Sequence, residues 1–188
     1  MSEVAFTDAT GKWYEASVNE MGSREVITGI GNGLFAGERD VTRAEFAAII
    51  VRALGLSAKA DISAFSDIYA GSWYAGAVNK AYEYGLVSGI GGGMYAPFRP
   101  ITREEAMVLI WRAAQLVGFS GSVGSIDDFP DAGNVSDWAM TAARWNVGTG
   151  LIVGSGGMLL PAENISRAET AVLVLRLLRE AGLVDNRA

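Results

Sequence analysis

Three arginines recur at a nearly fixed spacing, and their position suits them to bind an anion. Arg43, Arg103 and Arg167 are separated by 60 and 64 residues, and each directly follows a threonine or serine. A Ser or Thr with Glu three residues later marks a helix start, where unpaired backbone N–H groups carry partial positive charge. A cation there is unfavourable for the helix but favours a bound carboxylate or phosphate. The pattern therefore predicts three anion sites; pairing with a nearby aspartate, or solvation, is the alternative for each arginine.

Three tryptophans and three aspartates recur in phase with the arginines. Trp13, Trp73 and Trp138 each follow a Phe-x-Asp motif by a few residues. An exposed indole face is a common platform for a sugar ring, although a tryptophan at a helix start can equally belong to the core. An aspartate in such a loop most simply accepts backbone N–H groups. The residues for which we expect this structural role are Asp8, Asp67 and Asp131.

A glycine-rich turn lies between the tryptophan and the arginine of each copy. The turns begin at Gly29, Gly89 and Gly154. Glycines in such runs supply the positive φ angles that other residues avoid. The Gly-x-Gly-x-Gly pattern is superficially like a phosphate-binding loop, but no strand precedes it and no Gly-Lys-Ser/Thr follows. We therefore do not expect a nucleotide site.

These markers keep a constant order, so the chain consists of three copies of one unit. We place the units at residues 1–58, 59–122 and 123–188. Segments 57–64 and 118–127, rich in Gly, Ser, Ala and Asp, are the expected linkers. One unit is too small to bury its own apolar stripe. The three copies must therefore share a core.

Each unit is predicted to run from a loop into a first helix, then a glycine turn and a second helix. In the second unit, apolar residues at three- and four-residue steps indicate a first helix with Ser72 as N-cap and Gly85 at its end. The second helices begin at the Ser/Thr-x-x-Glu capping boxes and carry broad apolar faces that should pack together. The predicted fold is all-α: three helical hairpins in a pseudo-threefold bundle with a central three-helix core.

Composition excludes several classes of function. The 188 residues include 15 basic and 21 acidic ones, a formal net charge of −6, so no global field attracts nucleic acid or anionic lipid. Histidine and cysteine are absent, which removes the commonest general base, thiolate metal ligands and disulfides. The apolar runs are shorter than the ~20 residues of a membrane span. We therefore expect no cofactor, no metal, no nucleic acid and no membrane insertion.

The Phe-x-Asp motif, the tryptophan, the glycine turn and the Thr-Arg-Ala-Glu pattern at 42–45 together resemble S-layer homology domains over essentially the whole chain. The resemblance implies a three-helix core with outer prong loops and ligand grooves between the repeats. It also implies a secreted, non-catalytic anchor at the bacterial cell wall or S-layer, joined to a larger surface protein. The implied ligand is secondary cell-wall polysaccharide linked to peptidoglycan, often pyruvylated. The start of the chain does not read as a signal peptide, so the export signal is expected outside this sequence.

By position, the resemblance implies that the arginines contact the acidic ketal, that the tryptophans and glycine turns line the grooves, and that the aspartates support them. The second copy fits the family best. The third fits least, because its turn is one residue shorter, Ser166 replaces threonine, and Leu159 stands where the others have an aromatic residue. We expect loss of Arg103 to weaken binding most and loss of Arg167 least, with binding affected more than folding.

Two other functions stay open on the sequence. A protein–protein or self-assembly module could use the same aromatic and arginine residues as hot spots. A glycosidase would need a carboxylate pair such as Glu45 with Asp8, but Glu45 already belongs to a capping box. Trp111 and Trp145 do not recur in phase, and we expect them to serve packing.

Overall fold

The computed structural model describes residues 3–58 and 63–185, and within these ranges the chain is all-α, as predicted. Extended pairing in this part of the chain is limited to isolated bridges. Residues 59–62 of the predicted first linker lie outside the described residues, whereas the predicted linker 118–127 is irregular after its first residues. The α-helices are α1 Glu15–Ser23, α2 Arg43–Ala53, α3 Ala75–Glu83, α4 Arg103–Leu116, α5 Met140–Gly148 and α6 Arg167–Glu180; short 3-10 helices are η1 Thr7–Ala9, η2 Ala132–Asn134 and η3 Asp137–Ala139.

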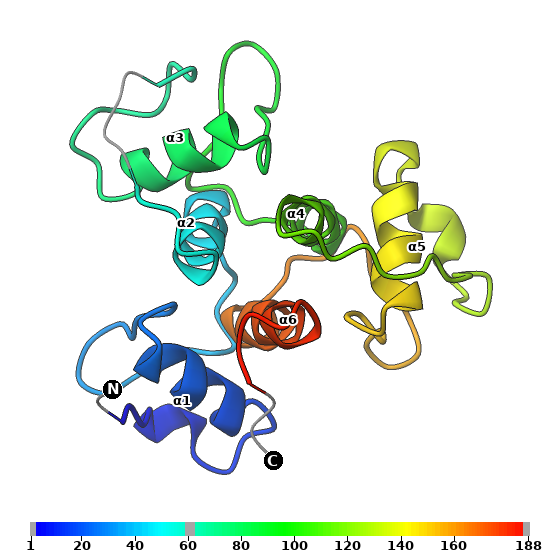
Figure 1. Ribbon diagram of the computed structural model, residues 1–188, viewed down its shortest axis with the longest axis horizontal. Coiled ribbons are helices and arrows are strands. Elements are labelled where there is room, and N and C mark those ends of the chain that lie inside the picture. Colours follow the sequence, from blue (N-terminus) through cyan, green and yellow to red (C-terminus); the bar gives the residue numbers. More distant parts are fainter. Residues whose placement is uncertain (1–2, 59–62, 186–188) are drawn as a thin grey trace.

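The second helices of the three repeats form the centre of the molecule. Figure 1 shows α2, α4 and α6 side by side, surrounded by α1, α3 and α5. Side chains of these helices such as Phe46, Met107 and Leu177 are fully buried. Burial of each such side chain contributes about 1.5–3 kcal/mol, which explains why these helices lie together. The three-helix core is therefore confirmed, while the pseudo-threefold axis stays a prediction.

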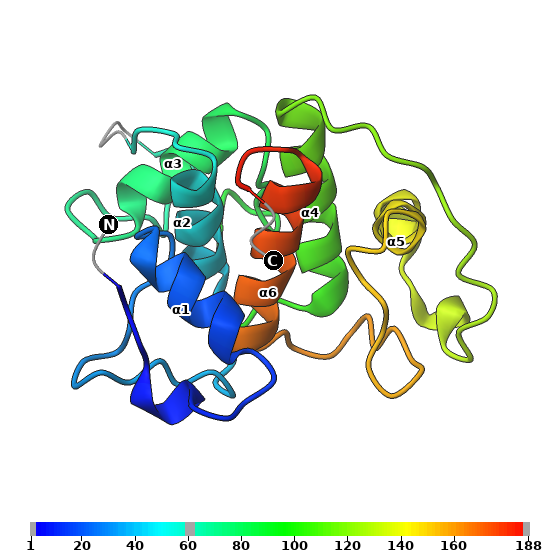
Figure 2. The same cartoon turned by 60° about the horizontal axis from the view of Figure 1, so that its bottom comes forward.

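The first helix of each repeat packs on the second helix of the preceding repeat. α3 lies against α2, α5 lies against α4, and α1 lies against α6 (Figures 1 and 2). The contact of α1 with α6 closes the ring and brings the first and last repeats together. Because the helix pairs form between repeats, the apolar face of one repeat is covered by its neighbours.

A ring of backbone hydrogen bonds joins the repeats just before the central helices. The N–H of Val41 donates to the carbonyl of Ile165 (3.1 Å), that of Ile165 to Ile101 (3.2 Å), and that of Ile101 to Val41 (3.0 Å). All three residues are buried. Since buried backbone polar groups must be paired, this ring fixes the three helix starts relative to one another.

The three predicted capping boxes are confirmed. In α2 the hydroxyl of Thr42 accepts from the N–H of Glu45 (3.2 Å), and the Glu45 carboxylate accepts from the N–H of Thr42 (2.9 Å). The same reciprocal pair is present at the starts of α4 and α6. Each central helix therefore begins where the sequence placed it.

The first helix of the second repeat begins later than predicted. Ser72 is not its N-cap: α3 starts at Ala75 after Tyr74, which provides no side-chain cap, and the Ser72 carbonyl instead accepts from the Ala75 N–H (3.0 Å). This turn buries Tyr74 and leaves Trp73 exposed. The predicted end is confirmed, because Gly85 follows the helix with φ +68°.

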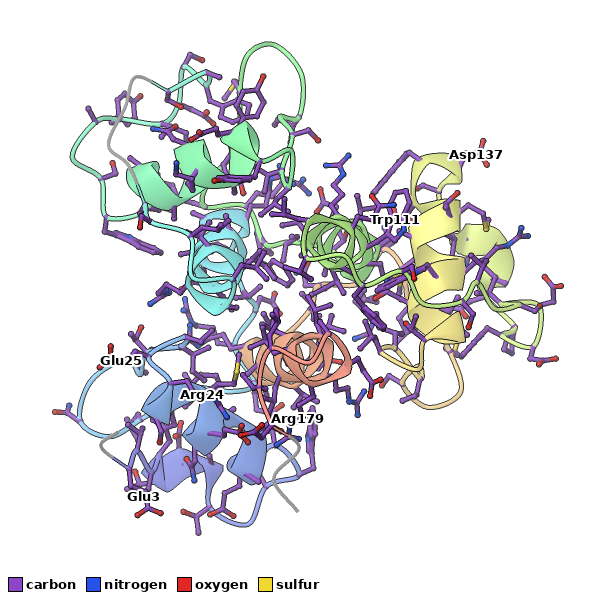
Figure 3. The ribbon with its side chains drawn as sticks, in the orientation of Figure 1. Glu3, Arg24, Glu25, Trp111, Asp137 and Arg179 are labelled. Carbon is purple, nitrogen blue, oxygen red and sulfur yellow. The ribbon has the colours of Figure 1, made fainter. Side chains whose placement is uncertain are left out.

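The two tryptophans outside the repeat pattern serve packing, as predicted. Trp145 is buried, and Trp111 lies between α4 and α5, partly buried against the core (Figure 3). None of the described helices is long and apolar enough to cross a membrane.

Candidate ligand-binding grooves

The three predicted arginines are buried where one repeat meets the next, with exposed fractions of 6–7%. Arg43 shows the arrangement most fully. Its Nε donates to the Tyr95 carbonyl (2.9 Å), its Nη2 donates to the Ser88 carbonyl (2.9 Å), and its Nη1 pairs with Glu105 (3.0 Å). An arginine from repeat 1 thus joins α2 to the glycine turn and the capping box of repeat 2.

The other two arginines continue this order around the ring. Arg103 donates to the Leu159 carbonyl (3.0 Å) and pairs with Glu169 of α6. Arg167 donates to the carbonyls of Phe35 (3.0 Å) and Thr28 (2.8 Å), and its Nη1 lies 3.7 Å from Glu45 of α2. Each arginine is therefore neither solvated nor hydrogen-bonded to a Phe-x-Asp aspartate, which were the two alternatives.

The first backbone N–H groups of the central helices are hydrogen-bonded within the protein. The prediction that they are free to bind an anion is therefore wrong. The N–H of Arg43 donates to the Arg99 carbonyl (2.9 Å), and that of Ala44 donates to the Pro97 carbonyl (3.0 Å). α4 and α6 direct their first two N–H groups to the neighbouring repeat in the same way. Packing between repeats has satisfied the donors that an isolated helix would leave open.

The predicted order of binding losses, largest at Arg103 and smallest at Arg167, stays a prediction, but each arginine does not lie beside the turn of its own repeat, on which that order was based. Tyr95 lies under the guanidinium of Arg43 (4.6 Å to the ring centre) and Phe35 under that of Arg167 (4.7 Å). Leu159, which replaces this ring in repeat 3, contacts Arg103. The shortened turn and the missing aromatic ring therefore belong to the surroundings of Arg103 and not to those of Arg167, because each arginine reaches the turn of the next repeat. Burial of all three also removes the reason for expecting their loss to spare the fold.

The Phe-x-Asp aspartates accept backbone N–H groups, as predicted, from two residues that follow each glycine turn. The Asp8 carboxylate accepts from the N–H groups of Phe35 (2.8 Å) and Ala36 (2.7 Å). Ala36 has φ +57°, a left-handed conformation that costs free energy for any residue with a Cβ. The equivalent bonds run from Tyr95 and Ala96 to Asp67, and from Leu159 and Leu160 to Asp131.

The pKa values of two of these carboxyl groups, Asp8 and Asp131, differ from the ordinary value. Burial by itself raises the pKa of Asp8 and that of Asp131, but the hydrogen bonds from the backbone N–H groups outweigh it. The pKa of each carboxyl is therefore below its ordinary value of 3.8. The ionised carboxylate is the form that accepts these N–H groups, which explains why an acidic residue stands there.

The first glycine of each turn lines a groove and is required by close packing. A Cβ added to Gly29 would lie 2.6 Å from the Leu34 carbonyl oxygen and 2.9 Å from the Phe6 ring. Gly89 and Gly154 meet their own turns and the phenylalanines of their own motifs in the same manner. In each copy the recurring glycine therefore packs directly against the recurring phenylalanine.

The three recurring tryptophans are on the surface, so their assignment to the core is excluded. Trp13, Trp73 and Trp138 are 67%, 65% and 60% exposed. Tyr14 and Tyr74, the buried residues that follow the first two, make edge contacts with their rings. Each indole lies at the rim of a groove whose other walls come from different repeats.

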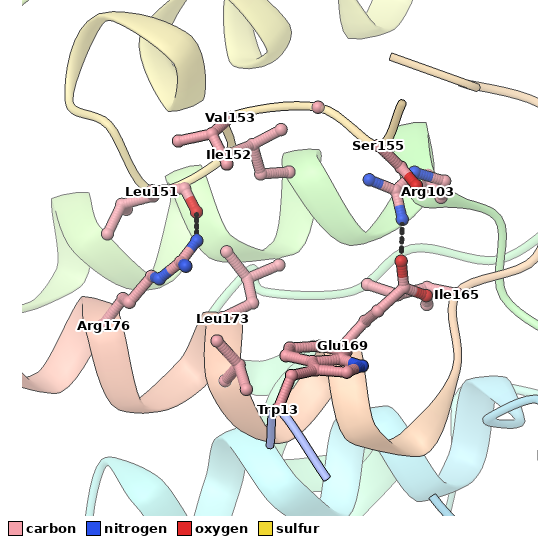
Figure 4. Close-up of a pocket in the computed structure, with 12 residues that line it drawn as sticks. Trp13, Arg103, Leu151, Ile152, Val153, Ser155, Ile165, Glu169, Leu173 and Arg176 are labelled. Atoms are coloured by element: carbon pink, nitrogen blue, oxygen red, sulfur yellow. Dashed lines mark hydrogen bonds and ion pairs between the residues drawn. The ribbon is translucent and has the colours of Figure 1, made fainter. Parts of the chain in front are cut away.

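Each groove is named here after the repeat that supplies its glycine turn and its central helix. Groove 1, of about 200 Å³, has the Gly29 turn and α2 as its walls, Arg167 from repeat 3 and Trp73 from repeat 2. Groove 2, of about 460 Å³, combines the Gly89 turn and α4 with Arg43 and Trp138. Groove 3, of about 220 Å³, combines the Gly154 turn and α6 with Arg103 and Trp13 (Figure 4). The structure thus brings the predicted arginines, tryptophans and glycines together, but from three repeats at a time.

A second set of arginines, missed on the sequence, lines the same grooves. Arg52, Arg112 and Arg176 lie on the three central helices in grooves 1, 2 and 3. Their spacings are also 60 and 64 residues, nine positions after the first set, which was the signal available. Arg112 donates to the Leu86 carbonyl (3.3 Å) and Arg176 to that of Leu151 (3.1 Å). With fewer protein partners than Arg43, this set is better placed to bind a ligand.

The grooves differ in charge at one further position. Arg39 lines groove 1 and pairs with Glu45, and Arg99 pairs with Glu105 beside groove 2. The equivalent residue of repeat 3 is Glu163, which is exposed. Groove 3 therefore has an acid nearby where the others have a cation.

The carboxylate pair that a glycosidase would need is already occupied. Both oxygens of Asp8 accept backbone N–H groups. Glu45 accepts from the Thr42 N–H and pairs with Arg39. Both carboxylates therefore have structural partners.

Comparison with known proteins identifies the family to which the chain belongs. Residues 5–47, 64–107 and 128–171 each match the family model described as the S-layer homology domain. An amylopullulanase of Thermoanaerobacterium thermosulfurigenes is 31% identical over 94% of this chain and 10% of its own length. The exoglucanase XynX of Acetivibrio thermocellus is 31% identical over 95% and 16%, and the surface-layer 125 kDa protein of Lysinibacillus sphaericus is 34% identical over 80% and 13%. The chain thus spans 10–16% of the length of these relatives.

Proposed function

Because the chain belongs to the S-layer homology domain family, we propose that its grooves bind an acidic polysaccharide of the bacterial cell wall that carries pyruvate ketals. As a member of this family the chain is a cell-surface anchoring or S-layer module, and it acts at the cell wall or S-layer. The observation that carries the proposal is the presence, in every groove, of at least two arginines together with one exposed tryptophan.

The two arginines of a groove have different roles in this proposal. In groove 2, Arg43 is fixed by three protein partners and supplies a buried positive charge, whereas half-buried Arg112 has one long hydrogen bond and a guanidinium available to the ligand. A carboxylate bound by Arg112 gains a charge-assisted hydrogen bond of about 1.5–3 kcal/mol. The ketal carboxylate is the part of a pyruvylated sugar that such a site would select.

The tryptophan of each groove is proposed to pack against the sugar ring. Trp138 at the rim of groove 2 is 60% exposed, so its indole face is free to pack against the C–H groups of a ring held by Arg112. A neutral sugar would lack the carboxylate, and a simple carboxylic acid would lack the apolar face. The combination therefore favours an acidic sugar over either part alone.

Three grooves on one module suit a repeating polymer. Once one acidic residue is bound, other residues of the same chain reach the next groove at high effective concentration, so that weak individual sites give firm attachment. We propose that this attachment holds the remainder of a larger surface protein at the wall. The module supplies attachment and not hydrolysis, so incubation with purified walls should release no reducing sugar.

The deciding experiment is calorimetric titration of the chain with protein-free wall polysaccharide before and after chemical removal of pyruvate. We expect binding to the native polymer and at least a tenfold loss after the ketals are removed. Equal binding to both polymers would refute the acidic ketal as the ligand. Failure to bind either, together with capture of a second copy of this chain, would favour the self-assembly function instead.

A further inference from the structure

Glu104, the second residue of α4, is a buried acidic side chain that the proposed binding does not use. It is 7% exposed, and a glutamate is rarely buried to this extent unless its carboxylate is paired. Here one carboxylate oxygen accepts from the backbone N–H of Ser136 and the other from the Ser136 hydroxyl, each at 2.9 Å. Both hydrogen bonds of this repeat 2 carboxylate are therefore made to a single residue of repeat 3.

Ser136 begins the turn that carries the tryptophan of groove 2. It directly precedes η3, and its carbonyl accepts from the N–H of Ala139 (2.9 Å). Between them lies Trp138, whose indole is 60% exposed at the rim of groove 2. The wall of that groove is α4, the helix to which Glu104 belongs. The carboxylate thus ties the rim of groove 2 to the wall of the same groove.

The tryptophans of the other two grooves have a different support. Tyr14 follows Trp13 and Tyr74 follows Trp73, and each tyrosine is buried with its ring edge-on to the indole at 5.3 and 5.4 Å. The residue after Trp138 is an alanine, which offers no ring.

The loop that leads to the tryptophan is also longest in repeat 3. Trp138 follows the aspartate of its Phe-x-Asp motif by seven positions, whereas Trp13 and Trp73 follow theirs by five and six. A longer loop has more conformational freedom to lose when it is ordered. The indole of groove 2 therefore needs an additional contact to hold it.

Glu104 stands only where this support is missing. The second residue of α2 is Ala44 and that of α6 is Ala168. These are the helices on which α3 and α1 pack, directly after their tyrosines. α4 and the turn on it have the opposite combination, Glu104 with Ala139.

We propose that Glu104 is a positioning residue of groove 2, which holds the indole of Trp138 where it can pack against a sugar bound by Arg112. The inference rests on the proposed function, because it names a residue that governs the affinity of one groove without touching the ligand. A ligand that packs on a mobile side chain must immobilise it, which reduces affinity about two- to tenfold.

The test replaces Glu104 in a protein that binds through groove 2 alone. Trp13→Ala and Trp73→Ala remove the platforms of grooves 3 and 1, and both residues are more than half exposed, so the fold should persist. In this background we expect Glu104→Ala to bind the methyl glycoside of a pyruvylated hexose about fivefold more weakly in calorimetry. Glu104→Gln, which keeps an oxygen acceptor and the length of the side chain, should bind within twofold of the background.

The matched control is the same Glu104→Ala change in a protein that binds through groove 1 alone, made with Trp13→Ala and Trp138→Ala. Its affinity should stay within twofold, because Glu104 lies outside groove 1. The fold should tolerate the change, since alanine is the natural residue at the same place in α2 and α6 and half-buried Ser136 can be hydrated. Should Glu104→Ala fail to fold, Ser136→Ala removes the hydroxyl contact alone and should show a smaller loss at groove 2.

A second measurement reports on the indole without any ligand. In the ¹⁵N-labelled groove 2 background the tryptophan side chains are Trp111, Trp138 and Trp145, and Trp138→Phe identifies the signal of Trp138. The heteronuclear NOE of its indole N–H should fall in Glu104→Ala and recover in Glu104→Gln. The signal of buried Trp145 should not change, which a general loosening of the fold would not allow.

The outcomes separate the positioning role from the proposed function. If the groove 2 background does not bind the probe, the proposed function fails there, whatever the NOE shows. If the background binds but the NOE of Trp138 is the same in Glu104→Ala, or the affinity falls by less than twofold, the positioning role is refuted and the proposed function stands. An equal loss of affinity at groove 1 would also refute it, because the effect would then be one on the whole fold.

Discussion

Arg43 and Arg112 line the same groove, and their replacement should separate folding from binding. Arg43 is 6% exposed and makes two hydrogen bonds to carbonyls of repeat 2 and an ion pair with Glu105. Arg43→Ala leaves these partners without their buried cation. Loss of one partner of a buried ion pair costs about 3–5 kcal/mol. For a chain of this length we expect a Tm lower by about 6–20 °C.

Arg112→Ala is the matched control in the same groove. Arg112 is half-buried and has one hydrogen bond of 3.3 Å, so its loss should cost about 0.5–1.5 kcal/mol of stability. Its proposed ligand contact is worth about 1.5–3 kcal/mol, which corresponds to roughly 10- to 150-fold weaker binding at groove 2.

The assays are urea unfolding for stability and calorimetric titration with pyruvylated hexose for binding. A background with Trp13→Ala and Trp73→Ala confines the titration to groove 2. If Arg43→Ala unfolds at the parent's urea midpoint, loss of the arginine does not lower the stability of the fold. The residue is then not a structural link between repeats. If Arg112→Ala binds like its background, the second arginine set does not hold the ligand.

Three further predictions follow from the same contacts. The lowered pKa values of Asp8, Asp131 and Glu105 mean that their stabilising contribution is complete above the ordinary values of 3.8 and 4.5 and is lost as the pH falls through the lower folded values. Tm should therefore be level above about pH 5 and fall below about pH 4; a Tm that rises on acidification would contradict this. Residues 59–122 expressed alone should be unfolded or aggregated by circular dichroism, because α3 loses α2 and α4 loses α5; a cooperative melt of that fragment would refute the shared core. Glu163→Arg should strengthen binding at groove 3 by a fewfold at low salt without lowering Tm, and an unchanged affinity in calorimetry would show that this position does not act on the groove.

Local rules in the sequence determined the parts of the structure that depend on short spans of chain. The capping boxes fixed the starts of α2, α4 and α6, because they involve residues only three positions apart. Gly85 fixed the end of α3 through its positive φ. The repeat period itself located the arginines, tryptophans and glycines that line the grooves. Even Arg52, Arg112 and Arg176 carry that period, with spacings of 60 and 64 residues.

Tertiary packing decided which repeats share a groove. Arg43 meets Tyr95, Arg103 meets Leu159 and Arg167 meets Phe35, contacts that cross 52, 56 and 132 residues. No local rule selects the next repeat's turn over the same repeat's own, because both offer the same carbonyls. The choice follows from closing three small apolar faces into one core, which sets α1 against α6 and satisfies the helix-start amides with neighbouring loops. For the same reason Tyr74 is buried and Trp73 is exposed. Only the packing of the three repeats against one another determines which of these two aromatic residues stays on the surface.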